Sequence, residues 1–281
     1  MPRKLYRFGG MTFALESDAP LERSPVCEAF RVPDGVPDHT ICLRFSDALP
    51  TPPTDALRRD DVFRWQAGAQ RHLLQWVSAP GDIPHFTYAV THGAHTDVIF
   101  ASAYRTGASV STALEAVGLF DVFAARGMLV LHSAYIVTSA GEAILFSGPS
   151  GIGKSTQAAL WQRCAGARVV NGDRALVDVG RRTANGIFYA GTSGISENVT
   201  APIRAIVLLG QSSENRVFIP SPRAAFAGVL SQCAYYEWDA RSAEQMTECV
   251  ARLVSDVPVL RMGCLPDATA VEALRGKLGG I

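Results

Sequence analysis

The sequence predicts a chain of two parts: a mainly β module over residues 1–105 and an α/β domain over residues 106–281. In the first part, short runs of alternating apolar and polar residues are separated by clusters of Pro and Gly, which is typical of strands and turns. In the second part, apolar strand-like runs alternate with helical patterns, and a glycine-rich loop lies between one strand and one helix. The length of 281 residues suits one large domain or two modest ones.

Composition excludes several classes of function. Lys plus Arg and Asp plus Glu number 26 each, so the formal net charge is zero. Nonspecific binding to nucleic acid or to an anionic membrane needs an excess of basic residues, and we expect neither partner. No signal peptide and no apolar run of about 18 residues is evident, which predicts a cytoplasmic protein. The six cysteines are widely spaced without a C-x-x-C pair, which predicts reduced cysteines, most of them in the core.

Three alternating runs predict an antiparallel sheet in the first part: Thr40–Phe45, His72–Val77 and Thr96–Ser102. The proline-rich and charged stretch Ser46–Asp61 predicts a loop, which could act as a mobile flap. Further along the chain, apolar residues at helical spacing predict a helix that leads into the second part: Val110, Ala113, Leu114, Val117 and Ala124. The predicted boundary between the two parts lies near residue 106.

Two histidines of the first part, His92 and His95, have a spacing that could bind a metal. Gly93 between them indicates a turn, and no third ligand is evident in the sequence. A solvated loop is therefore the favoured interpretation.

The second part predicts strands and helices in alternation. We expect strands over 128–137, 142–148, 167–171, 174–179, 203–210, 215–220 and 258–262, and helices over 154–164, 222–231, 243–253 and 268–277. Ser221 and Asp267 are of the residue types that cap helix N-termini, and Pro222 suits a first helical position.

The stretch 148–155, GPSGIGKS, matches the P-loop pattern G-x-x-x-x-G-K-[ST] between an apolar strand and a helix. Its glycines let successive backbone amides turn inward, where they and the helix N-terminus bind phosphate. Lys154 would contact the β- and γ-phosphates and Ser155 would ligate Mg²⁺, so the predicted cofactors are ATP and Mg²⁺. The predicted nucleotide-binding residues are Gly148, Ser150, Gly151, Ile152, Gly153, Lys154, Ser155 and Thr156.

Two further polar residues flank this loop. Asp173, in VVNGDRAL, follows an apolar strand, where an acid could ligate Mg²⁺ or accept a proton from a hydroxyl; an equally good interpretation is a turn residue in NGD. His132 interrupts the apolar strand before the loop, and a hydrogen-bonded core histidine is the favoured interpretation from pattern alone. The strand IRAIVLLGQ ends without an acid, so it does not resemble a Walker B strand.

The stretch 131–177, from LHSAYIV through the P-loop to NGDRALV, resembles the core of the HPr kinase/phosphorylase family, whose fold is related to phosphoenolpyruvate carboxykinase. The resemblance covers roughly residues 128–275 and implies an HPr kinase/PEP carboxykinase-like P-loop domain. It also implies that Asp173 is the general base, that His132 lies near the reacting phosphate, and that Lys154 with the loop amides binds ATP.

Two departures from the family pattern bear on the substrate. Gly172 stands where the family has the first acid of a pair, which would weaken metal binding or the reverse phosphorolysis. The signature E-[IV]-R-G-[LIF]-G of bifunctional HPr kinases is absent, and YAGTSGISEN occupies its place. We therefore expect a substrate other than HPr. Similar stand-alone proteins include kinases of lasso-peptide clusters, which suggests a serine of a peptide or protein.

The predicted function is an ATP-dependent kinase with Asp173, Lys154 and His132 as catalytic residues and Ser155 and Asp173 as metal ligands. We expect the first module to select the hydroxyl-bearing peptide or protein. A nucleotide-binding accessory module without phosphotransfer and a kinase of a small molecule such as free serine are the alternatives. The oligomeric state stays open, a homo-oligomer included.

Overall fold

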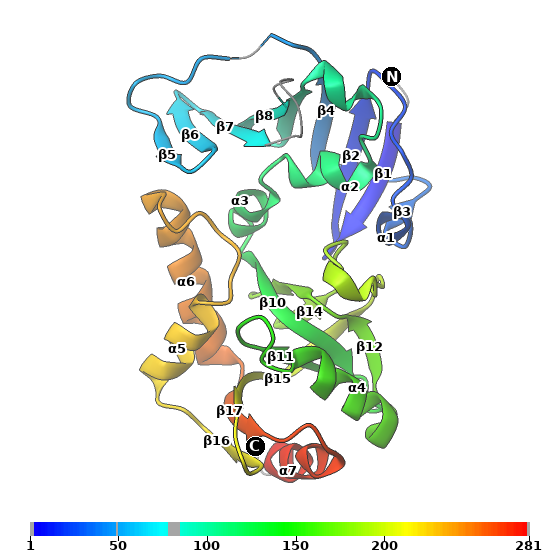
Figure 1. Cartoon of the computed structure of the whole chain (residues 1–281), viewed down its shortest axis with the longest axis vertical. Coiled ribbons are helices and arrows are strands. Elements are labelled where there is room, and N and C mark those ends of the chain that lie inside the picture. The colour runs from blue at the N-terminus through cyan, green and yellow to red at the C-terminus, as the bar shows by residue number, and fades with distance from the viewer. Residues whose placement is uncertain (1–2, 49, 78–84, 280–281) are drawn as a thin grey trace. The chain divides into compact units, whose positions relative to one another are not determined.

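The computed structural model describes residues 3–48, 50–77 and 85–279 (Figure 1). The chain divides into two compact units, Met1–Val122 and Phe123–Ile281, with the division inside helix α3 (Leu119–Ala124). The first unit thus includes residues 106–122, which the sequence pattern had placed in the second domain. No helix among the described residues has the length and apolar character needed to span a membrane.

The first unit contains a nine-stranded sheet with the strand order β3-β1-β2-β4-β9-β8-β7-β6-β5. Its strands are β1 (Arg3–Phe8), β2 (Met11–Ser17), β3 (Arg31–Val32), β4 (His39–Phe45), β5 (Leu57–Arg59), β6 (Val62–Ala67), β7 (Gln70–Val77), β8 (His85–His92) and β9 (His95–Phe100). Its helices are α1 (Pro25–Glu28), the 3-10 helix η1 (Ser102–Arg105) and α2 (Val110–Glu115), followed by α3.

Several sequence predictions for this unit are confirmed and three are wrong. Strands β4, β7 and β9 occupy the predicted segments, and Gly93, with φ +56°, lies in the turn between β8 and β9. The sheet is not wholly antiparallel, because β4 runs parallel to both β2 and β9. Strand β5 lies inside the predicted loop 46–61. The predicted bridging helix is two helices, and Gly118 between them has φ +68°.

A buried ion pair links strand β6 of this sheet to helix α3. Arg64 on β6 donates a hydrogen bond to the carboxylate of Asp121, and their side chains are 8% and 10% exposed. Arg71 on β7 lies 3.8 Å from the same carboxylate. Removing one partner of a buried pair is costly, because the remaining charge loses a compensating charge in a medium of low dielectric constant.

Replacement of Asp121 by Ala should therefore lower the free energy of unfolding by about 3–5 kcal/mol. The matched control is Arg23→Ala, which breaks the ion pair of Arg23 with Glu28. Because the Arg23 side chain is 78% exposed, this substitution should lower the free energy of unfolding by less than about 1 kcal/mol. Urea unfolding of the full chain, followed by circular dichroism, measures both. Equal effects of the two substitutions would contradict a structural role for the buried pair.

The second unit has strands β10 (Met128–Val137), β11 (Ala143–Ser147), β12 (Arg168–Asn171), β13 (Arg174–Asp178), β14 (Thr183–Asn185), β15 (Thr200–Gln211), β16 (Arg216–Phe218) and β17 (Val259–Cys264). Its helices are α4 (Lys154–Ala165), the 3-10 helix η2 (Gly191–Ser193), α5 (Pro222–Leu230), α6 (Ala240–Asp256) and α7 (Ala268–Leu278). The predicted caps are confirmed: the side chain of Ser221 accepts from the amide of Ala224, and that of Asp267 accepts from the amide of Thr269.

The pairing of these strands overturns the predicted fold class, an α/β, HPr kinase/PEP carboxykinase-like P-loop domain. Strands β10, β13, β14, β15 and β11 pair in a closed ring, a five-stranded barrel in which only the β11–β15 pair is parallel. The described residues of the whole chain are 39% strand and 27% helix. Alternating strand and helix patterns predicted an α/β domain, but apolar runs do not determine which strands pair with one another or in which direction.

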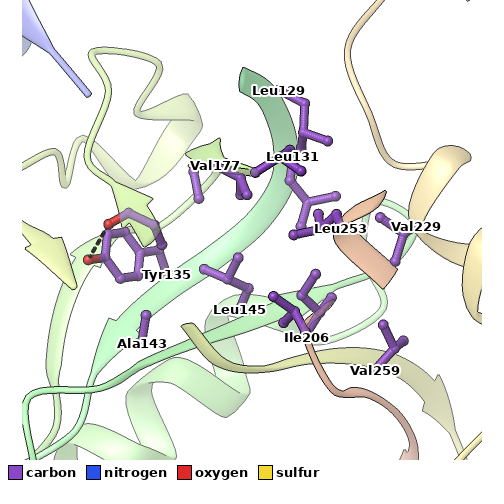
Figure 2. Packing of buried hydrophobic residues seen from close by; sticks show 14 of the residues in the cluster. Leu129, Leu131, Tyr135, Ala143, Leu145, Val177, Ile206, Val229, Leu253 and Val259 are labelled. Atoms are coloured by element: carbon purple, nitrogen blue, oxygen red, sulfur yellow. Dashed lines mark hydrogen bonds between the residues drawn. The ribbon is translucent and has the colours of Figure 1, made fainter. Parts of the chain in front are cut away.

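Side-chain alternation along β10 separates two apolar cores in the second unit. Leu129, Leu131 and Tyr135 face the core that includes residues of α5 and α6, and Figure 2 shows Leu131 near Leu253 of α6. Ala134 and Ile136 face the other core, which includes residues of α4 and α7. The even-numbered face of β10, to which His132 belongs, is therefore the face that α4 covers.

Candidate functional site

The P-loop connects β11 to α4 and has the backbone conformation that the motif predicts. Gly148, Gly151 and Gly153 all have positive φ angles, of +144°, +77° and +113°, which other residues rarely adopt. A Cβ atom at position 148 would lie 3.2 Å from Cγ2 of Ile152 and 3.4 Å from the carbonyl oxygen of Leu209. Helix α4 begins with Gly153 as its N-cap and has no side-chain cap among the described residues. Its N-terminus therefore presents backbone amides, the donors that bind phosphate in such loops.

Lys154 is the first residue of α4, and its side chain folds back over the loop. Its ammonium group donates hydrogen bonds to the carbonyl oxygens of Gly148 (2.9 Å) and Pro149 (3.0 Å). The residue is only 7% exposed, and this burial lowers the pKa of Lys154, an effect that the charge of Asp173 opposes. Ser150, Ser155 and Thr156 are exposed. The loop thus holds one positive charge beside its own carbonyls and leaves three hydroxyls accessible.

The turn between β12 and β13 is organised by Asn171. The Oδ1 atom of Asn171 accepts hydrogen bonds from the amides of Asp173 and Arg174, both at 2.9 Å, and its Nδ2 donates to the carbonyl oxygen of Ile187 at 2.7 Å. Because the fully buried Asn171 performs the turn chemistry, the carboxylate of Asp173 is available for other contacts. The turn role therefore belongs to Asn171, and the role of Asp173 as a site residue stays a prediction.

The carboxylate of Asp173 lies between His132 and Arg174. Its Oδ1 atom is 3.5 Å from Nε2 of His132, and its Oδ2 atom accepts a hydrogen bond from Nε of Arg174 at 3.2 Å. The guanidinium of Arg174 also lies 5.3 Å from the centre of the Tyr189 ring, a cation–π distance. Each carboxylate oxygen thus has its own partner, so the orientation of Asp173 is determined from both sides.

Charge and burial determine the protonation of His132. Desolvation lowers the pKa of His132, and the charges of Lys154 and Arg174 lower it further, whereas Asp173 raises it. The imidazole is therefore neutral near pH 7, and its contact with Asp173 is a polar contact of a neutral ring. The charges of Lys154 and Asp173 both act on the pKa of His132, and the charge of Asp173 also acts on the pKa of Lys154, so the three side chains belong to one electrostatic environment.

The segment around η2 packs against the acid turn. A Cβ atom at Gly191 would lie 2.7 Å from Cγ and 2.8 Å from Cβ of Asp173. A Cβ atom at Gly172 would lie 2.3 Å from Oγ and 2.6 Å from Cβ of Ser193. Glycine at both positions is therefore a steric requirement of this packing, and the backbone as it stands has no space for an acidic side chain at position 172.

The structure brings the predicted residues His132, Lys154 and Asp173 into one site, with the phosphate loop beside it. Sequence reasoning assigned no role to Arg174 and did not identify the η2 segment. A basic residue after an acid in a turn is too common to signal an ion pair. The η2 contacts join residues about 20 positions apart and leave no local pattern, although the glycine-rich sequence GTSG was a usable signal of a close backbone approach.

A scan of the chain against protein-family models finds no match, and neither does a search of curated proteins. The resemblance to the HPr kinase family therefore stays a prediction, and the function has to be inferred from the residues of this site.

The first prediction from this geometry concerns the pKa of His132 in the nucleotide-free chain without Mg²⁺. Lys154→Ala should raise this pKa, because a positive charge that opposes the imidazolium is lost; Asp173→Asn should lower it, because a stabilising negative charge is lost. A pH titration of the His132 ring signals by NMR measures both. Arg163→Ala, which removes a basic group from the last turn of α4, is the control and should leave the pKa unchanged. Shifts of the same sign in the two test variants would contradict the described charge arrangement.

The second prediction compares two glycines of the η2 segment that share a left-handed backbone. At Gly194, with φ +65°, an added Cβ would have no neighbouring atom within 4 Å, whereas at Gly191, with φ +53°, it would press on Asp173. Gly194→Ala should cost about 1–2 kcal/mol of unfolding free energy from backbone conformation alone. Gly191→Ala should cost more and should also shift the NMR signals of the His132 ring. Indistinguishable behaviour of the two variants in chemical unfolding and NMR would show that the Asp173 contact is absent.

Proposed function

We propose that this chain is an ATP-dependent kinase that transfers a phosphoryl group to a hydroxyl, with a serine of a peptide or protein as the acceptor. The observation that carries the proposal is the position of the Asp173 carboxylate, which His132 and Arg174 orient and which shares its electrostatic environment with the P-loop Lys154. A P-loop alone supports nucleotide binding; an oriented carboxylate near it supports proton abstraction.

The residues present fit ATP and Mg²⁺. The positive-φ glycines and the N-terminus of α4 offer amides to phosphate oxygens, and Lys154 offers a positive charge. Ser155 and Asp173 supply the hydroxyl and carboxylate oxygens that Mg²⁺ prefers. When bound, ATP would supply the phosphoryl group and Mg²⁺ would neutralise charge on the phosphates.

Each residue then has a defined task. Asp173 takes the proton of the acceptor hydroxyl as the oxygen attacks, and His132 and Arg174 hold the carboxylate in one orientation. Lys154 stabilises negative charge on the transferring group, for which it must release its bonds to the carbonyls of Gly148 and Pro149. The resemblance to peptide-cluster kinases motivates a peptide serine as the acceptor, and the first unit is the part that we expect to bind it.

The experiment incubates the full chain with Mg²⁺ and ATP labelled in the γ-phosphate, together with serine-containing peptides, matched alanine peptides and free serine. Asp173→Asn should reduce transfer by about 10²–10⁴-fold, the usual contribution of a general base, and should retain nucleotide binding. Lys154→Ala should weaken nucleotide binding. Glu272→Gln removes an exposed carboxylate on α7 and should change neither property.

Transfer that survives in Asp173→Asn would refute the role of Asp173. Transfer to free serine but to no peptide would refute the peptide acceptor and support a small-molecule kinase.

Gly172 favours a second candidate function, a nucleotide-binding accessory module without phosphotransfer. The atoms of Ser193 occupy the space that an acid at this position would need, so a second metal-binding carboxylate is absent from this turn. Nucleotide binding with no labelled product from any acceptor would favour this candidate over the kinase.

A further inference from the structure

A second group of ligand-type side chains lies in the first unit, on three adjacent parallel strands. The register pairs Glu16 of β2 with Cys42 of β4, and Cys42 with Asp97 of β9, so the three residues form one row across the sheet. Ile41 and Leu43, which flank Cys42, are fully buried, whereas Cys42 is only partly buried. The row therefore lies on the face of the sheet opposite to the buried side chains of β4.

His95 completes a cluster with Cys42 and Asp97. The ligand atoms of these three residues all lie within 4.8 Å of one another, and Nε2 of His95 is 3.5 Å from Oδ1 of Asp97. Ligand atoms about 2.0–2.3 Å from a tetrahedral zinc ion are about 3.3–3.8 Å apart. Small side-chain rotations are therefore enough to bring the three atoms to coordination distances, without a change in strand register.

Glu16 adds a further carboxylate to this cluster. Its Oε2 atom lies 3.9 Å from Sγ of Cys42. Two basic groups offset the acidic charge: Arg44 is 3.9 Å from Asp97, and Arg3 is 3.7 Å from Glu16. Their side chains are 54% and 47% exposed, so each can turn into solvent when a cation binds.

We propose that Cys42, His95 and Asp97 bind one zinc-class divalent cation, with Glu16 or water as the fourth ligand. A thiolate and an imidazole together select zinc over Mg²⁺ and Ca²⁺, which prefer oxygen ligands. Bonds to Cys42, His95 and Asp97 replace water molecules of the hydrated cation, and the thiol proton of Cys42 passes to solvent. The site is separate from the P-loop site, and the proposal does not depend on kinase activity.

The position of the cluster indicates a structural effect. In the strand order of the sheet, β4 and β9 are the neighbours at which the segment β3-β1-β2-β4 meets the segment β9-β8-β7-β6-β5. A cation bound to Cys42 of β4 and Asp97 of β9 would cross-link these two neighbouring strands and so connect the two segments of the sheet. Zinc should therefore raise the temperature at which the first unit unfolds.

The test titrates the reduced full chain with Co²⁺, which reports thiolate coordination through its absorption spectrum, and then with Zn²⁺ as competitor. We expect one Co²⁺ per chain with a sulfur-to-metal charge-transfer band that Zn²⁺ removes. The charge-transfer band should be absent from Cys42→Ala. This variant should also bind zinc more weakly than the wild-type chain, by more than the ~10–100-fold that removal of an outer-shell partner typically costs. Cys164→Ala removes an exposed thiol of α4 in the second unit and is the matched control that keeps the band.

Three further measurements complete the test. His95→Gln and Asp97→Asn should each weaken Co²⁺ binding, whereas Glu272→Gln, which removes an exposed carboxylate of α7, should not. Zn²⁺ should raise the unfolding temperature of the wild-type chain but not that of Cys42→Ala, whose fold is checked by circular dichroism. No charge-transfer band in the wild-type chain, or a band that persists in Cys42→Ala, would overturn the proposal.

Discussion

The pairing of β10 with a different strand on each edge is the constraint on which the candidate site depends. On one edge, Ser133 is opposite Ser147, the last residue before the P-loop, and Oγ of Ser147 donates to the carbonyl oxygen of His132 at 2.8 Å. On the other edge, His132 is opposite Arg174, and the amide of Ser133 donates to the carbonyl oxygen of Asp173 at 2.9 Å. One strand thus positions the start of the phosphate loop, the histidine and the acid turn, because the burial of its alternate side chains in two cores fixes the register of its pairing.

The same strand explains why polar groups persist in an apolar region. Residues of β10 alternate between two cores, so His132 replaces an apolar side chain on the face covered by α4. Partial burial disfavours the charged imidazole, and the nearby ammonium of Lys154 disfavours it further. A neutral ring beside a carboxylate that also binds Arg174 is a stable arrangement, because each oxygen of Asp173 has a partner of suitable polarity.

The two units present different kinds of chemistry. The second unit offers backbone amides, a lysine and an oriented carboxylate, which suit phosphate and proton transfer. The first unit offers a thiol, an imidazole and carboxylates on one face of a sheet, which suit a softer cation. In the first unit, strand register aligns Cys42 and Asp97 in one row across the sheet. In the second unit, the site combines a residue of β10, the first residue of α4 and a residue of the turn between β12 and β13.

Local sequence was sufficient to predict the strands of the P-loop region and the helix caps, because periodicity and capping chemistry are local properties. The glycine spacing of the P-loop singled out Lys154, but the local pattern favoured a core histidine at position 132 and left Asp173 open between a turn residue and a site residue. Only the family resemblance assigned those two residues to a site. It was not sufficient for the five-stranded ring, since an apolar run such as that of β15 is compatible with either strand direction and with several partners. The role of Asn171 in the turn, the packing of Gly191 on Asp173 and the meeting of Cys42 with His95 depend on tertiary contacts. These contacts join residues that are distant in sequence, and hydrogen-bond register and steric fit select them after the local elements have formed.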